Sequence, residues 1–309
     1  MRKLRIGLIG TGRWGECHLE ALCSVPNAEV VAICDRREER LNAAGDKFGI
    51  ARRYLREEEL IAQDDIDLIS VVTFEKAHLA PVLAALRSGK HVLVEKPVST
   101  SADETRAMLQ AAAESGKRLF PGHLLRFDSR YAEVASALGK GTLGDPVSLY
   151  FKRSRQRSLL QTYQRTHTVY ELMIHDIDLA LWYTGSRVKS VKAYGAYPTG
   201  SGAPDVLWAN LEMESGALAV LHSNWMTPDE AGIVMNDAAE IIGTSGTAQF
   251  ANGGSNLQLW DERGRTSPDY FIHHALNGST FGALREQLTY ICSCVARGTK
   301  PEYTSFDDA

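Results

Sequence analysis

The sequence predicts an α/β protein with two domains, a doubly wound parallel sheet followed by an α+β domain with an open, mostly antiparallel sheet. Two observations lead to this prediction. Short apolar runs alternate with helical patterns up to about residue 120, and longer runs of alternating polar and apolar residues follow. The length of 309 residues exceeds that of one ordinary domain of this class. We expect the domains to be residues 1–122 and 123–309.

The first domain is expected to be a parallel sheet covered by helices on both faces, because apolar strands that alternate with helices form such sheets. Gly89 directly follows one helical pattern and is a common C-terminal stop. The expected strands are residues 4–9, 30–34, 68–72, 91–94 and 118–120, and the expected helices are residues 14–25, 38–48, 78–88 and 102–115.

The second domain has few helical patterns between its strands, which favours antiparallel pairing. An apolar helix at residues 169–183 interrupts them, and its apolar side chains point in nearly all directions, so we expect it to be buried. Residues 304–309 resemble the start of another helix and leave open whether the chain is truncated at its C-terminus. A further helix is expected at 131–138, and strands are expected at 147–155, 188–197, 206–213, 217–225, 238–243 and 257–260.

The composition argues against several classes of protein. Apolar residues make up 44% and charged residues 23%, and the formal net charge of −4 provides no basic surface for nucleic acid. No apolar run has the length of a membrane-spanning helix, and the N-terminus lacks a secretory signal. The five cysteines include no C-x-x-C pair, which is typical of reduced thiols. We therefore expect a cytoplasmic protein without nucleic-acid or membrane partners.

A glycine-rich turn with the pattern G-x-G-x-x-G lies near the N-terminus. It follows an expected strand and begins an expected helix, which is the context of a dinucleotide-binding turn. The first glycine permits the tight turn, the second lets the backbone approach a pyrophosphate, and the third lets the helix pack on the strand. The free N–H groups at the helix start favour the phosphates. The expected cofactor contacts here are Gly10, Thr11, Gly12, Arg13, Trp14 and Gly15.

The second expected strand ends at Asp35, twenty residues after the last glycine of the turn. A carboxylate at this point can accept both ribose hydroxyls of NAD and would repel the additional phosphate of NADP. Arg36 and Arg37 follow and could neutralise that phosphate, or they could belong to a solvated loop. The sequence therefore favours NAD, with Asp35 and Arg36 as contacts, and leaves NADP open.

A Glu95-Lys96-Pro97 motif follows the fourth expected strand. Ligands bind beyond the carboxyl ends of strands in open α/β sheets, so Lys96 is expected at the ligand site. There its amine could exchange a proton with a substrate hydroxyl while a hydride moves to or from the cofactor. The alternative is a Glu–Lys pair in a surface loop.

The run AALRSGKHVLVEKP at residues 84–97 resembles the signature of the Gfo/Idh/MocA oxidoreductase family. The glycine turn, residues 73–78 and the turn at residues 141–146 resemble this family as well, so the resemblance covers nearly the whole chain. It implies a Rossmann domain, a homo-oligomer (dimer or tetramer) formed through the C-terminal sheet, and NAD(P)-linked oxidation or reduction of a sugar, polyol or related carbonyl compound. It also implies that Lys96 is catalytic and that Thr73, Phe74, His78 and Glu95 line the cofactor.

The apolar helix of the second domain carries polar groups that need partners inside the protein. Glu171 and His175 are four residues apart and share a helix face, and Asp178 is placed to orient the imidazole. In the family that the chain resembles, the matching pattern is Asp, three residues, then His, and the His works with the lysine on the substrate hydroxyl. His175 fits that position, whereas Glu171 replaces the usual Asp. A metal site using Glu171, His175 and Asp176 with His123 or His167 has no compact ligand spacing to support it, so no metal is predicted.

Other candidate substrate contacts are weaker. His123 and Arg126 follow the fifth expected strand, where the two domains meet in the predicted order. Arg126 could hold a carboxylate or hydroxyl of the substrate or form a structural ion pair. Arg153, Arg155 and Arg157 alternate along an expected strand and could face the substrate or lie at a solvated sheet edge.

Three functions are compatible with these patterns. The first is a dehydrogenase or reductase in which Lys96 and His175 handle the proton while the nicotinamide handles the hydride. The second is a redox-neutral glycosidase that uses bound NAD in a transient oxidation, and the third is a non-enzymatic dinucleotide sensor. The presence of both Lys96 and His175 favours the first. The identity of the substrate and the direction of the reaction stay open.

Overall fold

The computed structural model describes residues 2–163, 166–251, 257–262, 264–266, 270–304 and 306. The chain divides into two compact units. The first combines the described residues up to Asp128 with those from Tyr270 onward, and the second contains the described residues between Ser129 and Asp269. Within these ranges, no helix has the length and apolar character required to cross a membrane.

The first unit is built on a parallel sheet with the strand order β3-β2-β1-β4-β5-β6, and neighbouring strands in this order pair in parallel. The chain reverses its direction of winding between β1 and β4, and dinucleotides bind at such a switch point in open α/β sheets. This topology confirms the doubly wound sheet predicted from the sequence. The strands are β1 (Leu4–Ile9), β2 (Ala28–Cys34), β3 (Arg53–Tyr54), β4 (Leu68–Val71), β5 (His91–Val94) and β6 (Leu119–Pro121).

Helices cover both faces of this sheet. On one face, Leu19 of α1 and Leu41 of α2 form an apolar cluster with Leu8 of β1. On the other face, Leu86 and Met108 pack with Ile69 of β4. The first face is covered by α1 (Arg13–Cys23), α2 (Glu38–Phe48) and α9 (Ala283–Arg297), and the second by α3 (Glu57–Ile61), α4 (Leu79–Arg87) and α5 (Ala102–Ser115).

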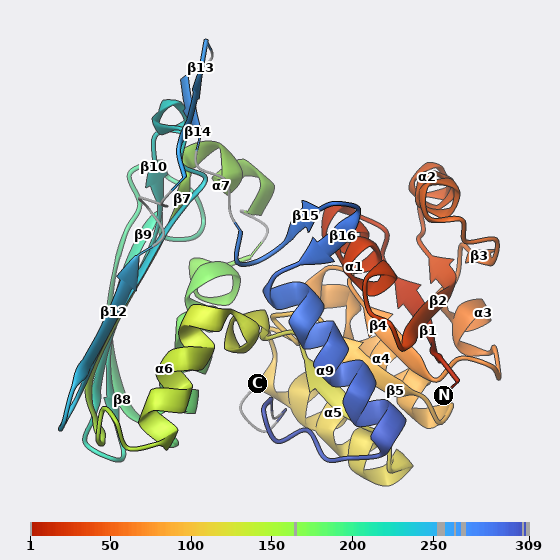
Figure 1. Cartoon of the computed structure of the whole chain (residues 1–309), viewed down its shortest axis with the longest axis horizontal. Helices are drawn as coiled ribbons and strands as arrows, with labels where there is room; N and C mark the ends of the chain where they lie inside the picture. Colours follow the sequence, from red (N-terminus) through yellow and green to blue (C-terminus); the bar gives the residue numbers. More distant parts are fainter. Residues whose placement is uncertain are drawn as a thin grey trace. The chain divides into compact units, whose positions relative to one another are not determined.

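The C-terminal segment returns to the first unit, and Figure 1 shows it in blue among the red and orange elements of that unit. Leu284, Leu288 and Ile291 of α9 are buried in the cluster that also contains α1. The hairpin of β15 (His274–Leu276) and β16 (Ser279–Phe281) lies beside α1, where the backbone N–H of Thr280 donates to Ser24 Oγ at 2.8 Å. This division differs from the expected one, in which residues 123–309 formed one domain. The expected start of a helix at residues 304–309, which left truncation of the chain open, lies mostly outside the described residues.

The second unit is built on a mixed sheet with the strand order β12-β11-β7-β10-β9-β8. The β7 and β10 strands pair in parallel, whereas the other neighbours in this order pair antiparallel, as predicted. The expected strand at 257–260 instead belongs to a separate hairpin of β13 (Leu259–Asp261) and β14 (Gly264–Thr266). The sheet strands are β7 (Pro146–Gln156), β8 (Val188–Ala196), β9 (Val206–Met213), β10 (Leu218–Thr227), β11 (Met235–Gly243) and β12 (Thr247–Ala251).

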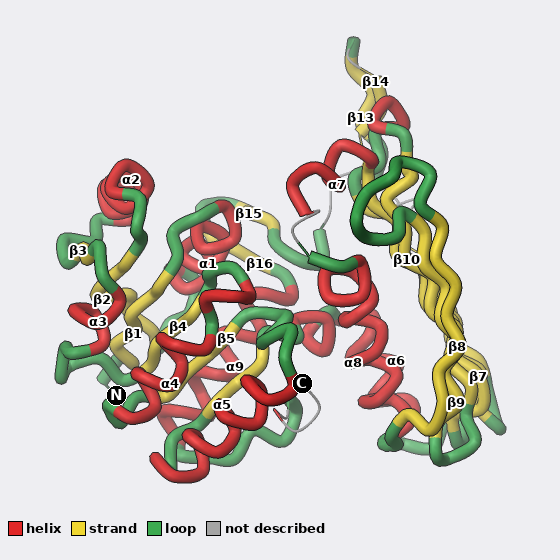
Figure 2. Tube along the Cα trace, turned by 180° about the vertical axis from the view of Figure 1, so that it is seen from behind, coloured by secondary structure: helices red, strands yellow, loops and turns green. Residues whose placement is uncertain are grey.

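Helices α6 (Ser129–Gly139) and α8 (Ile174–Thr184) lie along one face of this sheet (Figure 2). Tyr183 of α8 joins the layers, because its ring packs against Phe151 of β7 and its hydroxyl donates to the carbonyl of Tyr131 at 2.9 Å. The expected helix at 169–183 begins as a π-helical turn, η3 (Val169–Met173), and continues as α8. The remaining helices are α7 (Arg157–Tyr163) and the 3-10 turns η1 (Glu75–Ala77), η2 (Leu124–Phe127) and η4 (Asp229–Ala231).

Candidate functional site

The glycine-rich turn joins β1 to α1 with the geometry that its three glycines allow. Gly10 has a φ of +101°, and a Cβ there would lie 2.5 Å from the carbonyl oxygen of Val72. A Cβ on Gly15 would collide with the carbonyl oxygen of Gly10. At Gly12, in contrast, the nearest described atom to such a Cβ would be Arg40 Nη1 at 3.8 Å. The first and third glycines are therefore required by the fold, and the second leaves space above the turn.

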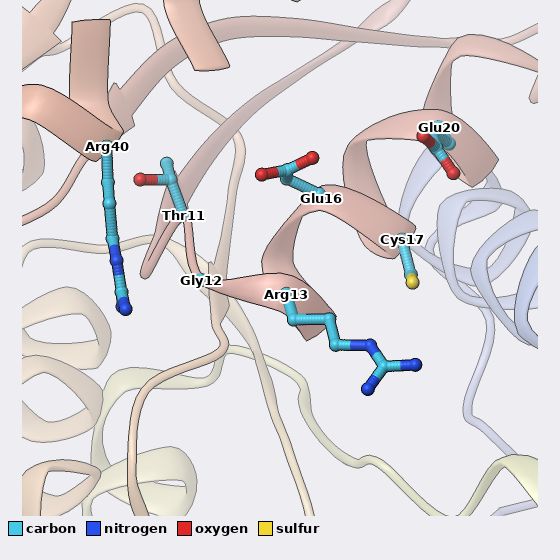
Figure 3. A pocket seen from close by; sticks show the side chains of 7 residues that line it. All are labelled: Thr11, Gly12, Arg13, Glu16, Cys17, Glu20 and Arg40. Atoms are coloured by element: carbon cyan, nitrogen blue, oxygen red, sulfur yellow. The ribbon is translucent and has the colours of Figure 1, made fainter. Parts of the chain in front are cut away.

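A cavity of about 390 Å³ opens at this turn (Figure 3). No described side chain caps the start of α1, so its first N–H groups are available to an anion. The side chains of Arg13 and Arg40 extend on either side of Gly12 in Figure 3. Arg40 is not among the residues expected from the glycine-rich motif, and its position five residues after Asp35 was the available signal. The lining residues are Thr11, Gly12, Arg13, Glu16, Cys17, Glu20 and Arg40.

The two glutamates of this cavity form ion pairs with the same lysine of α2. Lys47 Nζ lies 3.0 Å from Glu16 and 2.9 Å from Glu20. The hydrogen bond from Lys47 holds the pKa of Glu20 below its usual value. The three cationic side chains Lys47, Arg13 and Arg40 therefore outnumber the two carboxylates, and the two arginines beside the turn suit a pyrophosphate group.

Asp35 lies against the glycine-rich turn. Its Oδ2 accepts hydrogen bonds from the backbone N–H of Thr11 at 2.8 Å and from Thr11 Oγ1 at 3.1 Å. Its Oδ1 accepts from the backbone N–H of Arg37 at 2.8 Å. The carboxylate is thus fixed beside the turn, where a ribose would follow the pyrophosphate. The Arg36 side chain is exposed and forms an ion pair with Glu57 at 3.5 Å.

A second cavity, of about 480 Å³, lies beside the segment that follows β4. Thr73 is half-buried there, and Phe74 is 63% exposed. Two cationic side chains, two carboxylates and the apolar surface of α4 form the wall, and a mixed polar and apolar wall can hold a planar base. The lining residues are Arg36, Glu57, Lys76, Ala77, Leu79, Ala80, Leu83 and Glu104.

His78 is not among the residues that line this cavity, and its expected contact with the cofactor stays a prediction. It is buried, and its Nδ1 faces the carbonyl oxygens of Pro97 at 3.1 Å and Val98 at 3.2 Å. Its Nε2 faces the carbonyl oxygen of Thr73 at 3.1 Å. The imidazole therefore connects the segment after β4 to the segment after Lys96 and supports both.

Lys96 follows β5 at the carboxyl edge of the same sheet and is half-buried, and its peptide bond to Pro97 is cis. Glu95 is buried next to it, and its expected contact with the cofactor stays a prediction. Glu95 Oε1 lies 3.0 Å from His18 Nε2, and Oε2 accepts from the backbone N–H of Lys96 at 3.2 Å. Burial would raise the pKa of Glu95, but the hydrogen bond to His18 and the nearby charges of His18 and Lys96 outweigh it and hold this pKa below its usual value.

His123 and Arg126 follow β6 and are both buried in the first unit. Arg126 Nη1 donates to the carbonyl of Tyr303 at 3.4 Å, so this guanidinium faces the C-terminal segment of its own unit. Among the described residues, neither ring nitrogen of His123 has a hydrogen-bond partner. Their burial does not fit the direct substrate contacts expected from the sequence.

In the second unit, η3 positions Glu171 and the first turn of α8 positions His175. Glu171 is buried and His175 is half-buried. The following residue, Asp176, is fully buried and bonds to Arg153 of β7, with Oδ1 at 2.5 Å from Nη2. Asp176 therefore forms an ion pair with Arg153. Its carboxylate is used in this pair and is not placed as a ligand of the alternative metal site. Within the described residues, no group of three His, Cys, Asp or Glu side chains is arranged to hold a metal ion.

Arg153 is 2% exposed, and its expected contact with the substrate stays a prediction. Besides Asp176, its guanidinium bonds to Asp237 at 3.1 Å, and Arg155 bonds to the same carboxylate at 2.5 Å. Burial alone would lower the pKa of Arg153, but the Asp176 and Asp237 carboxylates outweigh burial and raise this pKa well above its usual value. Arg153 therefore links α8 to the sheet by a buried ion pair. Arg157 does not continue the expected strand, because it belongs to α7.

Comparisons with known proteins agree with both units. Residues 4–123 match an oxidoreductase family with an NAD-binding Rossmann fold (Gfo/Idh/MocA), and residues 131–249 match the C-terminal domain of the same family. The myo-inositol 2-dehydrogenase of Thermotoga maritima is 29% identical over 313 residues, which cover 98% of this chain and 92% of that protein. The inositol 2-dehydrogenase of Salmonella paratyphi B is 32% identical over 194 residues, 62% of this chain and only 57% of the length of that relative.

Solved structures show the same fold. The crystal structure of a probable dehydrogenase from Thermotoga maritima superimposes with a TM-score of 0.84 at 27% identity and covers 99% of this chain and 92% of that one. The apo scyllo-inositol dehydrogenase of Lactobacillus casei gives a TM-score of 0.86 at 21% identity, with coverage of 99% and 92%. At that identity the second likeness concerns the fold alone.

Proposed function

The chain belongs to the Gfo/Idh/MocA oxidoreductase family, and on that premise we propose that it is an NAD-dependent dehydrogenase acting on a hydroxyl-bearing carbon of a small polyol or sugar. The observation that carries the proposal is the placement of the glycine-rich turn, Asp35 and Lys96 along the carboxyl edge of one parallel sheet. The turn and its flanking arginines fit a pyrophosphate, Asp35 fits a ribose, and Lys96 follows the strand at which the reacting group of the substrate is expected.

The proposed reaction removes two hydrogens from a secondary alcohol. Bound NAD supplies the acceptor for the hydride that leaves carbon. Lys96 is proposed to accept the hydroxyl proton as the C–O bond becomes a carbonyl and to return it in the reverse reaction. His175 and Glu171 are proposed to hold the substrate hydroxyl, following the family pattern. His175 is half-buried, which suits a residue that contacts the substrate. Glu171 is buried, which suits a residue that supports this contact.

We propose a preference for NAD over NADP. The Asp35 carboxylate is held beside the turn by Thr11 and Arg37, so an additional phosphate on the ribose would approach a fixed negative charge. Arg36 and Arg40 reduce this repulsion but do not occupy the position of Asp35. In an Asp35→Asn variant, measured by fluorescence titration with NADH and NADPH, the ratio of the two dissociation constants is expected to move about tenfold toward NADPH.

The substrate class is proposed from relatives that are named as inositol dehydrogenases. The test is to follow NADH formation by absorbance with a panel of inositols, other polyols, sugars and sugar lactones. Replacing Lys96 with Met is expected to lower the rate by about 10²- to 10⁴-fold, the usual contribution of a general acid–base group, while NADH still binds. Lys140→Met, at an exposed lysine, is the matched control and should keep full activity.

The same experiment separates the alternative functions. A dinucleotide sensor would bind NADH and give no turnover with any compound on the panel. A redox-neutral glycosidase would also form no net NADH with this panel, so glycosides are added to it, and cleavage of a glycoside in the presence of bound NAD would identify this function. If NADH does not bind at all, the dinucleotide site itself is wrong.

We also propose that the chain forms a homo-oligomer through the sheet of the second unit. One face of this sheet exposes Tyr194 (59% exposed), Trp208 and Leu218. The Trp208 ring stacks on His222 of the neighbouring strand with ring centroids 3.9 Å apart, and such exposed apolar groups are typical of an interaction surface. Light scattering should show a dimer or tetramer, and Trp208→Glu should reduce it to smaller species.

A further inference from the structure

His18 occupies a position on α1 where an apolar side chain would be expected. It lies on the buried face of the helix next to Leu19 and Leu22, with 0% of its side chain exposed. The ring meets the edge of Trp14 at a centroid distance of 5.8 Å. Burying an imidazole beside a carboxylate costs desolvation that a leucine would avoid, so the pair is better explained by a requirement for orientation than by stability.

The partner of His18 is Glu95, whose side chain is 4% exposed. The two oxygens of this carboxylate have different hydrogen-bond partners. Oε1 lies 3.0 Å from His18 Nε2, and Oε2 accepts the backbone N–H of Lys96 at 3.2 Å. The carboxylate thus joins α1 to the residue that carries the proposed proton transfer.

Gly122, the residue directly after β6, packs closely against Glu95. A Cβ at position 122 would lie 2.9 Å from Glu95 Cα, Cδ and Oε1, a distance that real Cβ contacts do not show. The backbone after β6 is therefore packed directly on this side chain. With His18 on one side and Gly122 on another, Glu95 has little freedom to turn away from Lys96.

The same helix serves the cofactor and the lysine. The N-terminus of α1 follows Gly12, where the pyrophosphate is proposed to bind, and His18 lies less than two turns further along. Hydride and proton transfer require the nicotinamide and the lysine to be held in one geometry, and a displacement of about 1 Å can cost on the order of 100-fold in rate. A rigid connection from the glycine-rich turn to Lys96 would supply this alignment.

We propose that His18 is a positioning residue, which fixes the backbone of Lys96 through the Glu95 carboxylate and so aligns the lysine with the dinucleotide-binding turn. This inference rests on the proposed function for its catalytic consequence, but its structural content is independent of any substrate. The pair of variants that tests it is His18→Leu, which removes the donor and keeps a buried side chain, and His18→Gln, which retains an N–H donor at the end of the side chain.

The first measurement is hydrogen exchange of the full-length protein, followed by mass spectrometry. In His18→Leu the backbone amide of Lys96 loses its fixed acceptor, so peptides covering residues 95–98 should exchange at least about tenfold faster. Peptides from α5 should be unchanged, which distinguishes a local effect from general destabilisation. His18→Gln should exchange at a rate near that of the wild-type protein. Unchanged exchange at 95–98 in His18→Leu, or equal acceleration throughout the first unit, would overturn the proposal.

The second measurement is steady-state kinetics on a substrate from the polyol panel. His18→Leu should lower kcat by about 10- to 100-fold, since only alignment is lost, while the KM for NAD changes less than about threefold. His18→Gln should recover most of kcat. A His18→Leu enzyme with wild-type kcat, or a His18→Gln enzyme as impaired as His18→Leu, contradicts the inference. If the wild-type protein turns over nothing, the proposed function fails, and the exchange result alone decides the role of His18.

Discussion

The buried ion pairs of the second unit allow a quantitative prediction for Arg153→Met. Methionine has a similar length and no charge, so the change removes the guanidinium and keeps much of the packing. Asp176 then loses the cation that bonds it, inside a unit where it has no exposed surface. Asp237 keeps its second ion pair, with Arg155 at 2.5 Å. The loss of stability therefore comes mainly from the unpaired charge of Asp176.

The magnitude follows from the burial of both partners. Two unit charges about 4 Å apart attract by about 4 kcal/mol at an effective dielectric constant near 20. Removing one partner of a buried pair commonly costs about 3–5 kcal/mol, because the remaining charge stays desolvated. For a unit of this size, each kcal/mol lowers the melting temperature by about 3–4 °C, so we expect a decrease of about 9–20 °C.

Urea and thermal unfolding of the full chain, followed by tryptophan fluorescence, measure this effect. Four of the five tryptophans, Trp182, Trp208, Trp225 and Trp260, belong to the second unit, so the signal reports mainly on its unfolding. Lys189→Met is the matched control, since Lys189 pairs with Glu212 on an exposed surface and its loss should leave the midpoint unchanged. The double variant Arg153→Met/Asp176→Leu should recover most of the lost stability.

Two results would contradict a destabilising, unpaired charge at Asp176. One is a melting temperature of Arg153→Met within about 3 °C of that of the wild-type protein. The other is a double variant that is no more stable than the single one. The first result would mean that Asp176 finds another partner or is not desolvated. The second would mean that the loss comes from packing and not from an unpaired charge.

Three further predictions concern the first unit. Gly15→Ala should abolish NADH binding in a fluorescence titration, because its Cβ would collide with the carbonyl oxygen of Gly10; binding at wild-type affinity would show that the turn can relax. Lys90→Met should destabilise the first unit by about 1–3 kcal/mol in urea, since buried Lys90 donates to the carbonyls of Gln63 and Ile66 and burial lowers its pKa; an unchanged midpoint would contradict this. Burial and the charges of Lys117 and Arg118 lower the pKa of His91 to about 4, so folding stability should be lost as the pH falls from about 6.5 toward 4. His91→Gln, which keeps an acceptor for the N–H of Arg118, should remove part of this acid sensitivity, by no more than about 2 kcal/mol, and identical pH profiles would exclude His91 as its source.

The sequence by itself determined the elements whose pattern is local. The helices at Glu38–Phe48 and Ala102–Ser115 and the strands at His91–Val94 and Val206–Met213 have the boundaries predicted for them. Their periodicity and end signals lie within a few residues, so no distant contact is needed to specify them. The glycine-rich turn is similar, because the positive φ of Gly10 and the contact between Gly15 and the carbonyl oxygen of Gly10 arise from the strand–turn–helix geometry itself.

Only the tertiary structure decided which of these elements and side chains meet. The apolar face of α9 could cover any sheet, and its packing beside α1 depends on contacts with residues more than 250 positions earlier in the chain. Arg153 has the same sequence signal whether it faces a substrate or Asp176, and Glu95 has the same signal whether it faces a cofactor or His18. Sequence periodicity reports which face of an element is apolar, whereas the partner of a buried charge is set by the packing of distant segments.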